Sequence, residues 1–256
     1  MPDLYLYDDV PVLKNKLGIK DDKTLELVEA EQSRQKMMIL YERGFDDFSP
    51  DGLRSIHRTL FGDIYDWAGE YRLINIEKRE SLLGGRSVWY SNDDTIADDL
   101  ASVFREIRSK DWRQMPREEF VHELTILFSR IWRVHPFREG NTRTVVMMLT
   151  FFVEHYGYYM DQELMAISAG YVRDSFVMAS IDQYSEYEHL EKNEGLGNPT
   201  SISFTPLIRK HIDAIVGEYQ GTKYAAYTVL NQYFSFLETL KDCKDILKHH
   251  ITDAEI

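Results

Sequence analysis

The stretch from His135 to Arg143 concentrates side chains that can carry acid–base and phosphate chemistry. It reads His-Pro-Phe-Arg-Glu-Gly-Asn-Thr-Arg, with one imidazole, one carboxylate and two guanidinium groups. An imidazole titrates near neutral pH, so it can take a proton from an alcohol. A carboxylate beside a phosphate needs a cation between them, and Mg²⁺ prefers such oxygen ligands. These residues therefore predict a phosphate site that contains a general base.

Two predicted helices position this stretch. Upstream, apolar residues recur with the helical period at Phe120, Leu124, Leu127, Phe128, Ile131 and Trp132. Downstream, residues 145–153 are apolar nearly all round, as in a helix buried in a core. Pro136 disfavours helix at His135, so we expect a loop that ends at a helix start. The N–H groups there have no partner within the helix and, together with the helix dipole, favour an anion.

The same residues resemble the Fic family motif, His-x-Phe-x-(Asp/Glu)-Gly-Asn-Gly-Arg-x-x-Arg. The matching positions are His135, Phe137, Glu139, Gly140, Asn141 and Arg143, with the habitual Pro136. Two positions depart, because Thr142 replaces the last glycine and Val146 replaces the second arginine. Residues 53–69 resemble the helix pair that precedes the motif in this family. The resemblance implies an all-α, Fic-type helical domain with a small β-hairpin flap.

The resemblance also implies a role for each matching residue. His135 would be the general base that deprotonates a Ser, Thr or Tyr hydroxyl of a target protein, which attacks the α-phosphate of a nucleotide. Glu139 would hold Mg²⁺. Gly140 and Asn141 would allow the backbone to approach the phosphates closely, and Asn141 could donate its amide to them. Arg143 would point at the β- or γ-phosphate.

Two other loop positions leave alternatives open. If the residue at 142 needs a positive φ, Thr142 is penalised there and the phosphate cradle is distorted. If it is an ordinary helix N-cap, its hydroxyl accepts an N–H from the first turn. We favour the N-cap because the helix resumes at once. Arg138 is either solvated or a phosphate ligand, and both residues stay candidates for phosphate binding.

Val146 removes a positive charge from the expected site. A helical side chain at this position leans over the loop one turn back, but a valine cannot bind phosphate. In the Fic family the arginine there also pairs with an inhibitory glutamate from a Ser/Thr-x-x-x-Glu-Gly/Asn helix. Segments 102–106 and 150–154 have the Ser/Thr-to-Glu spacing but lack the residue that should follow. We therefore expect no internal arginine–glutamate clamp, so that the site is either open or restrained by another route, which could be an inhibitory partner protein, self-association or the C-terminal segment. Arg173 either supplies the missing charge or is a surface residue.

Composition limits the partners and the compartment. The 256 residues carry a net charge of −13, so we expect neither a nucleic acid nor a membrane as partner. The single Cys243 fits a reducing cytosol. The N-terminus lacks a basic segment followed by an apolar one, which favours a cytoplasmic protein and leaves signal-independent secretion as an alternative.

The chain is expected to have two parts. Residues 1–195 would form the Fic domain with an N-terminal arm, and residues 196–256 a C-terminal helical extension after a Gly- and Asn-rich linker. Gly84–Gly85, between two β-prone runs, predicts the turn of a hairpin. This hairpin, residues 76–90, resembles the family's flap, on which a target protein would dock by strand addition.

These features together favour a protein adenylyltransferase. It would transfer AMP, or another nucleotide monophosphate, from a nucleoside triphosphate to a hydroxyl side chain of a target protein. ATP would be the co-substrate and Mg²⁺ the cofactor. The alternative is a non-catalytic or weakly active nucleotide-binding or protein-interaction module with a degenerate motif. The intact His135, Glu139, Asn141 and Arg143 argue against decay of the motif, whereas Val146 argues for it.

Overall fold

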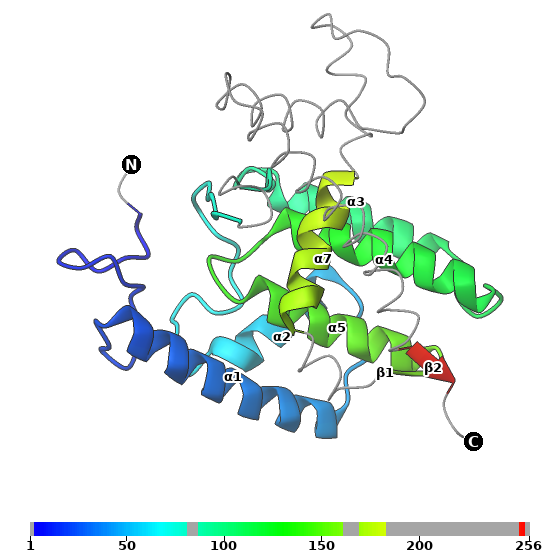
Figure 1. Cartoon of the computed structure of the whole chain (residues 1–256), viewed down its shortest axis with the longest axis horizontal. Coiled ribbons are helices and arrows are strands. Elements are labelled where there is room, and N and C mark those ends of the chain that lie inside the picture. The colour runs from blue at the N-terminus through cyan, green and yellow to red at the C-terminus, as the bar shows by residue number, and fades with distance from the viewer. Residues whose placement is uncertain (1–2, 81–86, 161–168, 183–250, 254–256) are drawn as a thin grey trace, which may run out of the picture.

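The N-terminal arm lies against the body of the molecule, as expected. The structure, a computed structural model, describes residues 3–80, 87–160, 169–182 and 251–253 (Figure 1). Within the arm, Leu6 and Leu13 form an isolated antiparallel bridge, and Tyr5 and Val12 are buried. The Tyr5 hydroxyl accepts a hydrogen bond from the Leu73 N–H at 3.1 Å, which ties the arm to a later segment.

Local capping rules fix the ends of the first two helices. Helix α1 (Asp22–Arg43) starts where the Asp21 carboxylate accepts the Thr24 N–H, and it ends at Gly44, whose φ is 75°. Helix α2 (Pro50–Phe61) starts where the Ser49 hydroxyl accepts the N–H of Gly52, with proline at the first helical position.

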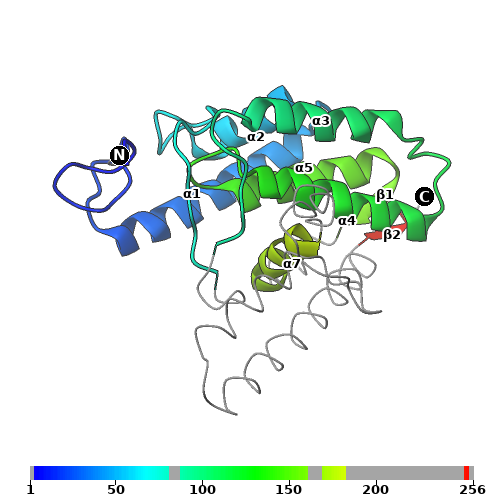
Figure 2. The same ribbon diagram turned by 90° about the horizontal axis from the view of Figure 1, so that it is seen from above.

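The core forms around helix α5 (Asn141–His155), which is buried along most of its length. Helix α5 packs against α2 and against α4 (Arg117–Val134), and α4 also contacts α3 (Ile96–Ser109) and α7 (Ala169–Asp182). Figure 2 shows α2 and α3 on one side of the α4 and α5 layer and α7 on the opposite side. None of the helices in the described part of the chain is both long and apolar enough to span a membrane.

The described strands lie away from the predicted flap. Strand β1 (Tyr158–Met160) pairs with β2 (Ile251–Asp253) in antiparallel register, with Tyr159 opposite Thr252. Residues 251–253, within the predicted C-terminal helical extension, are thus a short strand. Most of the extension and the predicted boundary at 195 lie outside the described residues.

The flap is described only on its two sides. Its predicted turn at Gly84–Gly85 lies outside the described residues. The sides approach each other where the Lys78 N–H donates to the Ser87 hydroxyl at 3.0 Å. Neither described side is a regular strand, so the predicted hairpin remains a prediction. These sides stand beside the loop between α4 and α5, and this contact builds the site.

Candidate active site

The loop between α4 and α5 is a tight turn with a left-handed residue at each end. His135 ends α4 with a φ of 50°, and its N–H donates to the Trp132 carbonyl at 3.0 Å. Gly140 precedes α5 with a φ of 80°. A Cβ atom at Gly140 would lie 2.4 Å from the Phe61 ring, so only glycine fits.

The His135 ring is buried in a single orientation with one nitrogen free. Its Nδ1 lies 3.3 Å from the Trp132 carbonyl, and because a carbonyl only accepts, this nitrogen carries the proton. The Tyr90 ring stacks on the imidazole at a centroid distance of 4.0 Å. Among the described residues, Nε2 has no hydrogen-bond partner. Burial lowers the pKa of His135 well below the usual histidine range, so the ring is neutral and Nε2 can accept a proton.

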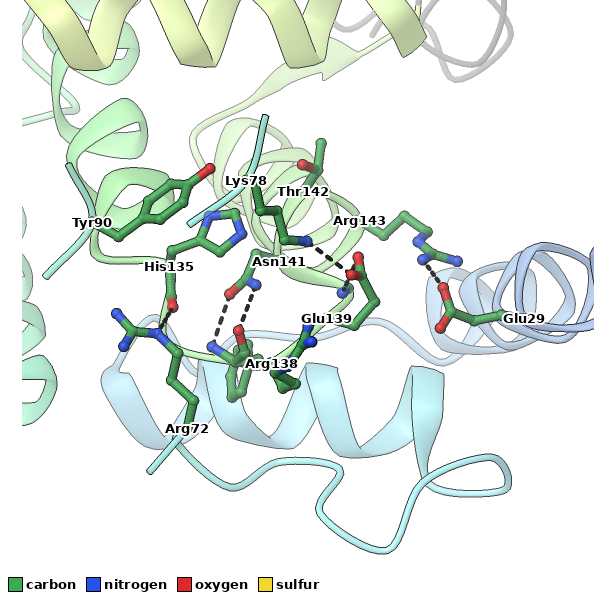
Figure 3. A network of polar contacts seen from close by, with 12 residues as sticks. Glu29, Arg72, Lys78, Tyr90, His135, Arg138, Glu139, Asn141, Thr142 and Arg143 are labelled. Carbon is green, nitrogen blue, oxygen red and sulfur yellow. Dashed lines mark hydrogen bonds and ion pairs between the residues drawn. The ribbon is translucent and has the colours of Figure 1, made fainter. Parts of the chain in front are cut away.

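Arg72 holds the backbone of His135 in place. Its side chain is buried, and its Nε donates to the His135 carbonyl at 2.9 Å (Figure 3). Its terminal nitrogens donate to the carbonyls of Ile74, at 2.7 Å, and of Ser91. One guanidinium thus connects the segments that precede and follow the flap to the end of α4. Sequence patterns did not reveal this role, because nothing marks a single arginine as buried.

His57, on the inner face of α2, holds the backbone of Glu139. The Gly69 N–H donates to Nδ1 at 2.8 Å, so the proton is on Nε2, which donates to the Glu139 carbonyl at 3.0 Å. The imidazole also stacks on the Phe137 ring at 3.8 Å, which places Phe137 as the buried anchor of the loop. Burial lowers the pKa of His57 to about 3. Its inward position on an amphipathic helix was the available signal in the sequence.

Glu139 faces a positive charge that comes from the flap. Its Oε2 lies 2.8 Å from Lys78 Nζ, and its Oε1 accepts the Gly140 N–H at 3.1 Å (Figure 3). Burial alone would raise the pKa of Glu139, but the Lys78 ammonium and the Gly140 N–H bring it down to about 2. Glu139 is therefore ionised, and one of its oxygens already binds a cation. Sequence analysis did not identify Lys78.

Arg143 pairs with a glutamate of α1, which corrects the expectation of no internal clamp. Its guanidinium bonds to the Glu29 carboxylate and, at 2.8 Å, to the Ser33 hydroxyl. It also lies 4.8 Å from the centre of the Phe61 ring. Glu29 accepts a second hydrogen bond from the Tyr65 hydroxyl. No sequence pattern predicted this pair, because Glu29 does not lie in the inhibitory motif. It also binds Arg143, the first arginine of the Fic motif, whereas the inhibitory glutamate of the family pairs with the arginine at the position of Val146.

Asn141 and Thr142 use their side chains differently from the expected way. Asn141 accepts the Phe137 N–H at 2.9 Å and donates to the Phe137 carbonyl at 2.8 Å, so its amide closes the loop. The N-cap of α5 is Gly140, without a side-chain cap, and the predicted N-cap at Thr142 is wrong. Thr142 lies within the first turn, where its hydroxyl accepts the Trp132 indole N–H at 2.9 Å. The φ of Thr142 is negative, so the backbone strain that a positive φ would cause is absent at this residue.

Arg173 lines the cavity, whereas Arg138 does not. Arg138 points away from the cavity and binds Asp3 of the arm with two nitrogens, at 3.0 and 2.7 Å. In this structure the guanidinium of Arg138 is therefore bound to Asp3, and Arg138 is not among the residues that line the cavity. Arg173 of α7 lies at the cavity wall, where it pairs with the buried carboxylate of Glu80. Val146 is partly buried against the core.

A cavity of about 320 Å³ joins these groups. Its lining comes from α1, the flap, α4, the loop, α5 and α7, and consists of Glu26, Lys78, Glu80, Trp132, His135, Glu139, Gly140, Asn141, Thr142, Arg143 and Arg173. Seven of the eight predicted site residues are in this list, and Arg138 is the exception. Among the described residues, no cluster of three or more His, Cys, Asp or Glu side chains could hold a metal ion, so a cation here would depend on Glu139 and a bound ligand.

Known proteins are similar to this chain in sequence and in fold. Residues 47–153 match the Fic/DOC family. The chain is 31% identical over 190 residues to the protein adenylyltransferase VbhT of Bartonella schoenbuchensis, covering 71% of this chain and 36% of that protein. It is 30% identical over 164 residues to the probable protein adenylyltransferase y4lH of Sinorhizobium fredii, covering 61% of this chain and 78% of that protein.

A solved structure agrees with these sequence matches. The N-terminal Fic domain of a VirB-translocated Bep effector protein from Bartonella quintana superposes with a TM-score of 0.54 at 25% identity. The match covers 64% of this chain and 81% of that chain. The chain spans only about a third of the length of VbhT, whereas it covers most of y4lH. From the sequence match and the shared fold, the chain belongs to the Fic/DOC family.

Proposed function

We propose that this chain is a protein adenylyltransferase, which moves AMP from ATP onto a hydroxyl side chain of a target protein. One observation carries this proposal. In the described part of the chain, His135 Nε2 is buried without a partner at the wall of a cavity that also holds three carboxylates, one ammonium and two guanidinium groups. The names of VbhT and y4lH support AMP as the transferred group.

The neutral imidazole is suited to act as the general base. Nε2 of His135 would accept the proton of the target hydroxyl as its oxygen attacks the α-phosphorus. A new oxygen–phosphorus bond forms, the bond from the α-phosphorus to the bridging oxygen breaks, and pyrophosphate leaves. Arg72 and the Trp132 carbonyl fix the backbone and the ring of His135, so Nε2 keeps one direction during this transfer.

The phosphates would lie between the start of α5 and the cationic side chains. The first N–H groups of a helix favour an anion. Arg143 and Arg173 line the cavity and would bind phosphate oxygens once released from their carboxylates. Glu139 would hold Mg²⁺, because one of its oxygens faces a cation and a single carboxylate with phosphate oxygens suits this metal. Bound there, Mg²⁺ would neutralise part of the triphosphate charge.

A protein target would dock beside residues 76–90. Leu73, just before the flap, and Trp89, within it, are large apolar residues with 70% and 53% of their surface exposed. Such exposed apolar groups next to a catalytic cavity favour a protein partner. We also propose that the protein acts in the cytosol and that an inhibitory partner protein or self-association regulates it.

Nucleotide labelling separates this function from its alternatives. The purified chain is incubated with a protein extract and with ATP that carries label on either the α- or the γ-phosphate. AMP transfer predicts protein labelling from α-labelled ATP alone, whereas labelling from the γ-position would show transfer of a phosphoryl group. Nucleotide binding without labelling would favour the non-catalytic module. Parallel reactions with GTP, CTP and UTP establish the preferred base.

A further inference from the structure

Charged side chains at the cavity form three cation–carboxylate pairs. The pairs join Lys78 with Glu139, Arg173 with Glu80 and Arg143 with Glu29. In each pair, at least one partner comes from outside the loop between α4 and α5. A triphosphate that enters this cavity therefore competes with carboxylates for every one of these cations.

The Lys78 pair differs from the others, because its carboxylate is the expected ligand of a metal. The Nζ atom lies 2.8 Å from Glu139 Oε2, while the Gly140 N–H already occupies Oε1. A divalent cation on Glu139 needs the oxygen that the ammonium holds. Since the two cations repel each other at this distance, Lys78 must leave when the divalent cation binds.

The flap keeps Lys78 close to the cavity after it leaves Glu139. Its backbone N–H is bound to the Ser87 hydroxyl. Two residues later, Glu80 is buried and bound to Arg173 and, at 3.3 Å, to the Tyr90 hydroxyl. In an extended segment, residues i and i+2 point to the same side, and both Lys78 and Glu80 line the cavity. The base of the lysine side chain is thus anchored, while its four-carbon stem lets the ammonium change partner.

We infer that Lys78 is a phosphate-binding residue, which exchanges Glu139 for a non-reacting phosphate oxygen when a divalent cation occupies that carboxylate. This inference rests on the proposed function and extends it to a residue outside the motif. The exchange compensates for Val146, which cannot contribute the positive charge of an arginine to the triphosphate. It also prevents an unpaired Glu139 carboxylate from repelling the nucleotide before the cation arrives.

The test compares Lys78→Met with a matched control, Lys110→Met. Lys110 and Glu123 also form a 2.8 Å pair, and their side chains are 23% and 24% exposed, close to the 25% and 32% of Lys78 and Glu139. Lys110 does not line the cavity. Methionine keeps much of the length of the lysine stem and removes the charge. Calorimetry then measures the binding of Mn²⁺ alone and of ATP with Mg²⁺ to the full chain.

The exchange predicts effects of opposite sign. Lys78→Met should bind Mn²⁺ about tenfold more tightly, because Glu139 loses its competing cation. It should bind ATP with Mg²⁺ about tenfold more weakly, because one hydrogen bond to a charged group is lost. Lys110→Met should change neither affinity. A loss of both affinities, or an unchanged affinity for either ligand in Lys78→Met, would overturn the inference. If the wild type and Lys110→Met bind no nucleotide at all, the proposed function itself fails.

Discussion

Replacing His57 by asparagine or glutamine should remove a defined part of the pH dependence of stability. His57 is fully buried and neutral, with a pKa of about 3, whereas a histidine in the unfolded chain has a pKa near 6.5. Below pH 6.5 the unfolded chain therefore binds a proton that the native state excludes. The stability from His57 is complete above pH 6.5 and is lost as the pH falls toward 3.

The magnitude follows from the interval between the two pKa values. Between pH 8 and pH 5, proton uptake by the unfolded chain extends over about 1.5 pH units, at about 1.4 kcal/mol per unit. The wild type should therefore lose about 2 kcal/mol more of its free energy of unfolding than either variant over this range. Burial also lowers the pKa of His135, but this contribution is common to the wild type and the variants and cancels in the comparison.

Urea unfolding of the three proteins at pH 8, 7, 6 and 5 measures this difference. The two variants also separate the hydrogen bonds of His57. Asparagine can keep the acceptor for the Gly69 N–H, and glutamine can keep the donor to the Glu139 carbonyl. Each substitution should lower the free energy of unfolding by about 1–3 kcal/mol at pH 8, because it leaves one buried partner unpaired. Only the asparagine variant should also weaken nucleotide binding, because it loses the hydrogen bond to the Glu139 carbonyl in the loop. An equal pH dependence in wild type and variants would refute a neutral, buried His57.

Further substitutions test the charged groups of the cavity. Glu139→Ala should abolish the dependence of nucleotide binding on Mg²⁺, and equal dependence in calorimetry would remove Glu139 as the metal ligand. Glu29→Gln should tighten ATP binding several-fold, on the order of 1 kcal/mol, because it removes a negative charge from Arg143; weaker binding would show that Glu29 positions this arginine instead. Arg173→Ala should weaken ATP binding about tenfold and should change AMP binding little. Arg138→Ala is the control and should change neither affinity. Equal losses of ATP and AMP affinity in Arg173→Ala would exclude a contact of Arg173 with the outer phosphates.

Features that depend on neighbouring residues were predictable from the sequence. The caps of α1 and α2 and the loop before α5 follow from residues within one turn of each boundary. The buried faces of α3 and α4 follow from the helical period of their apolar residues. The same kind of rule failed at Thr142, because the left-handed Gly140 begins the helix two positions earlier than a threonine N-cap would.

Contacts between distant segments could not be predicted in this way. Glu29 and Arg143 are 114 positions apart, and Lys78 and Glu139 are 61 apart. No spacing rule connects such residues, since their approach depends on how the helices and the flap pack. For the same reason, the sequence could not show that Arg138 turns toward Asp3. The motif identified the chemistry of the loop, whereas packing decides which carboxylate neutralises each cation.

The most direct test of the account compares AMP transfer by the wild type and by His135→Ala under single-turnover conditions, with nucleotide binding measured in parallel. Removing the imidazole should slow transfer by about 10² to 10⁴, the usual contribution of a general base. Nucleotide affinity should stay close to that of the wild type, because Nε2 faces the attacking hydroxyl and not the outer phosphates. Transfer by His135→Ala at the wild-type rate would contradict the assignment of His135 as the base.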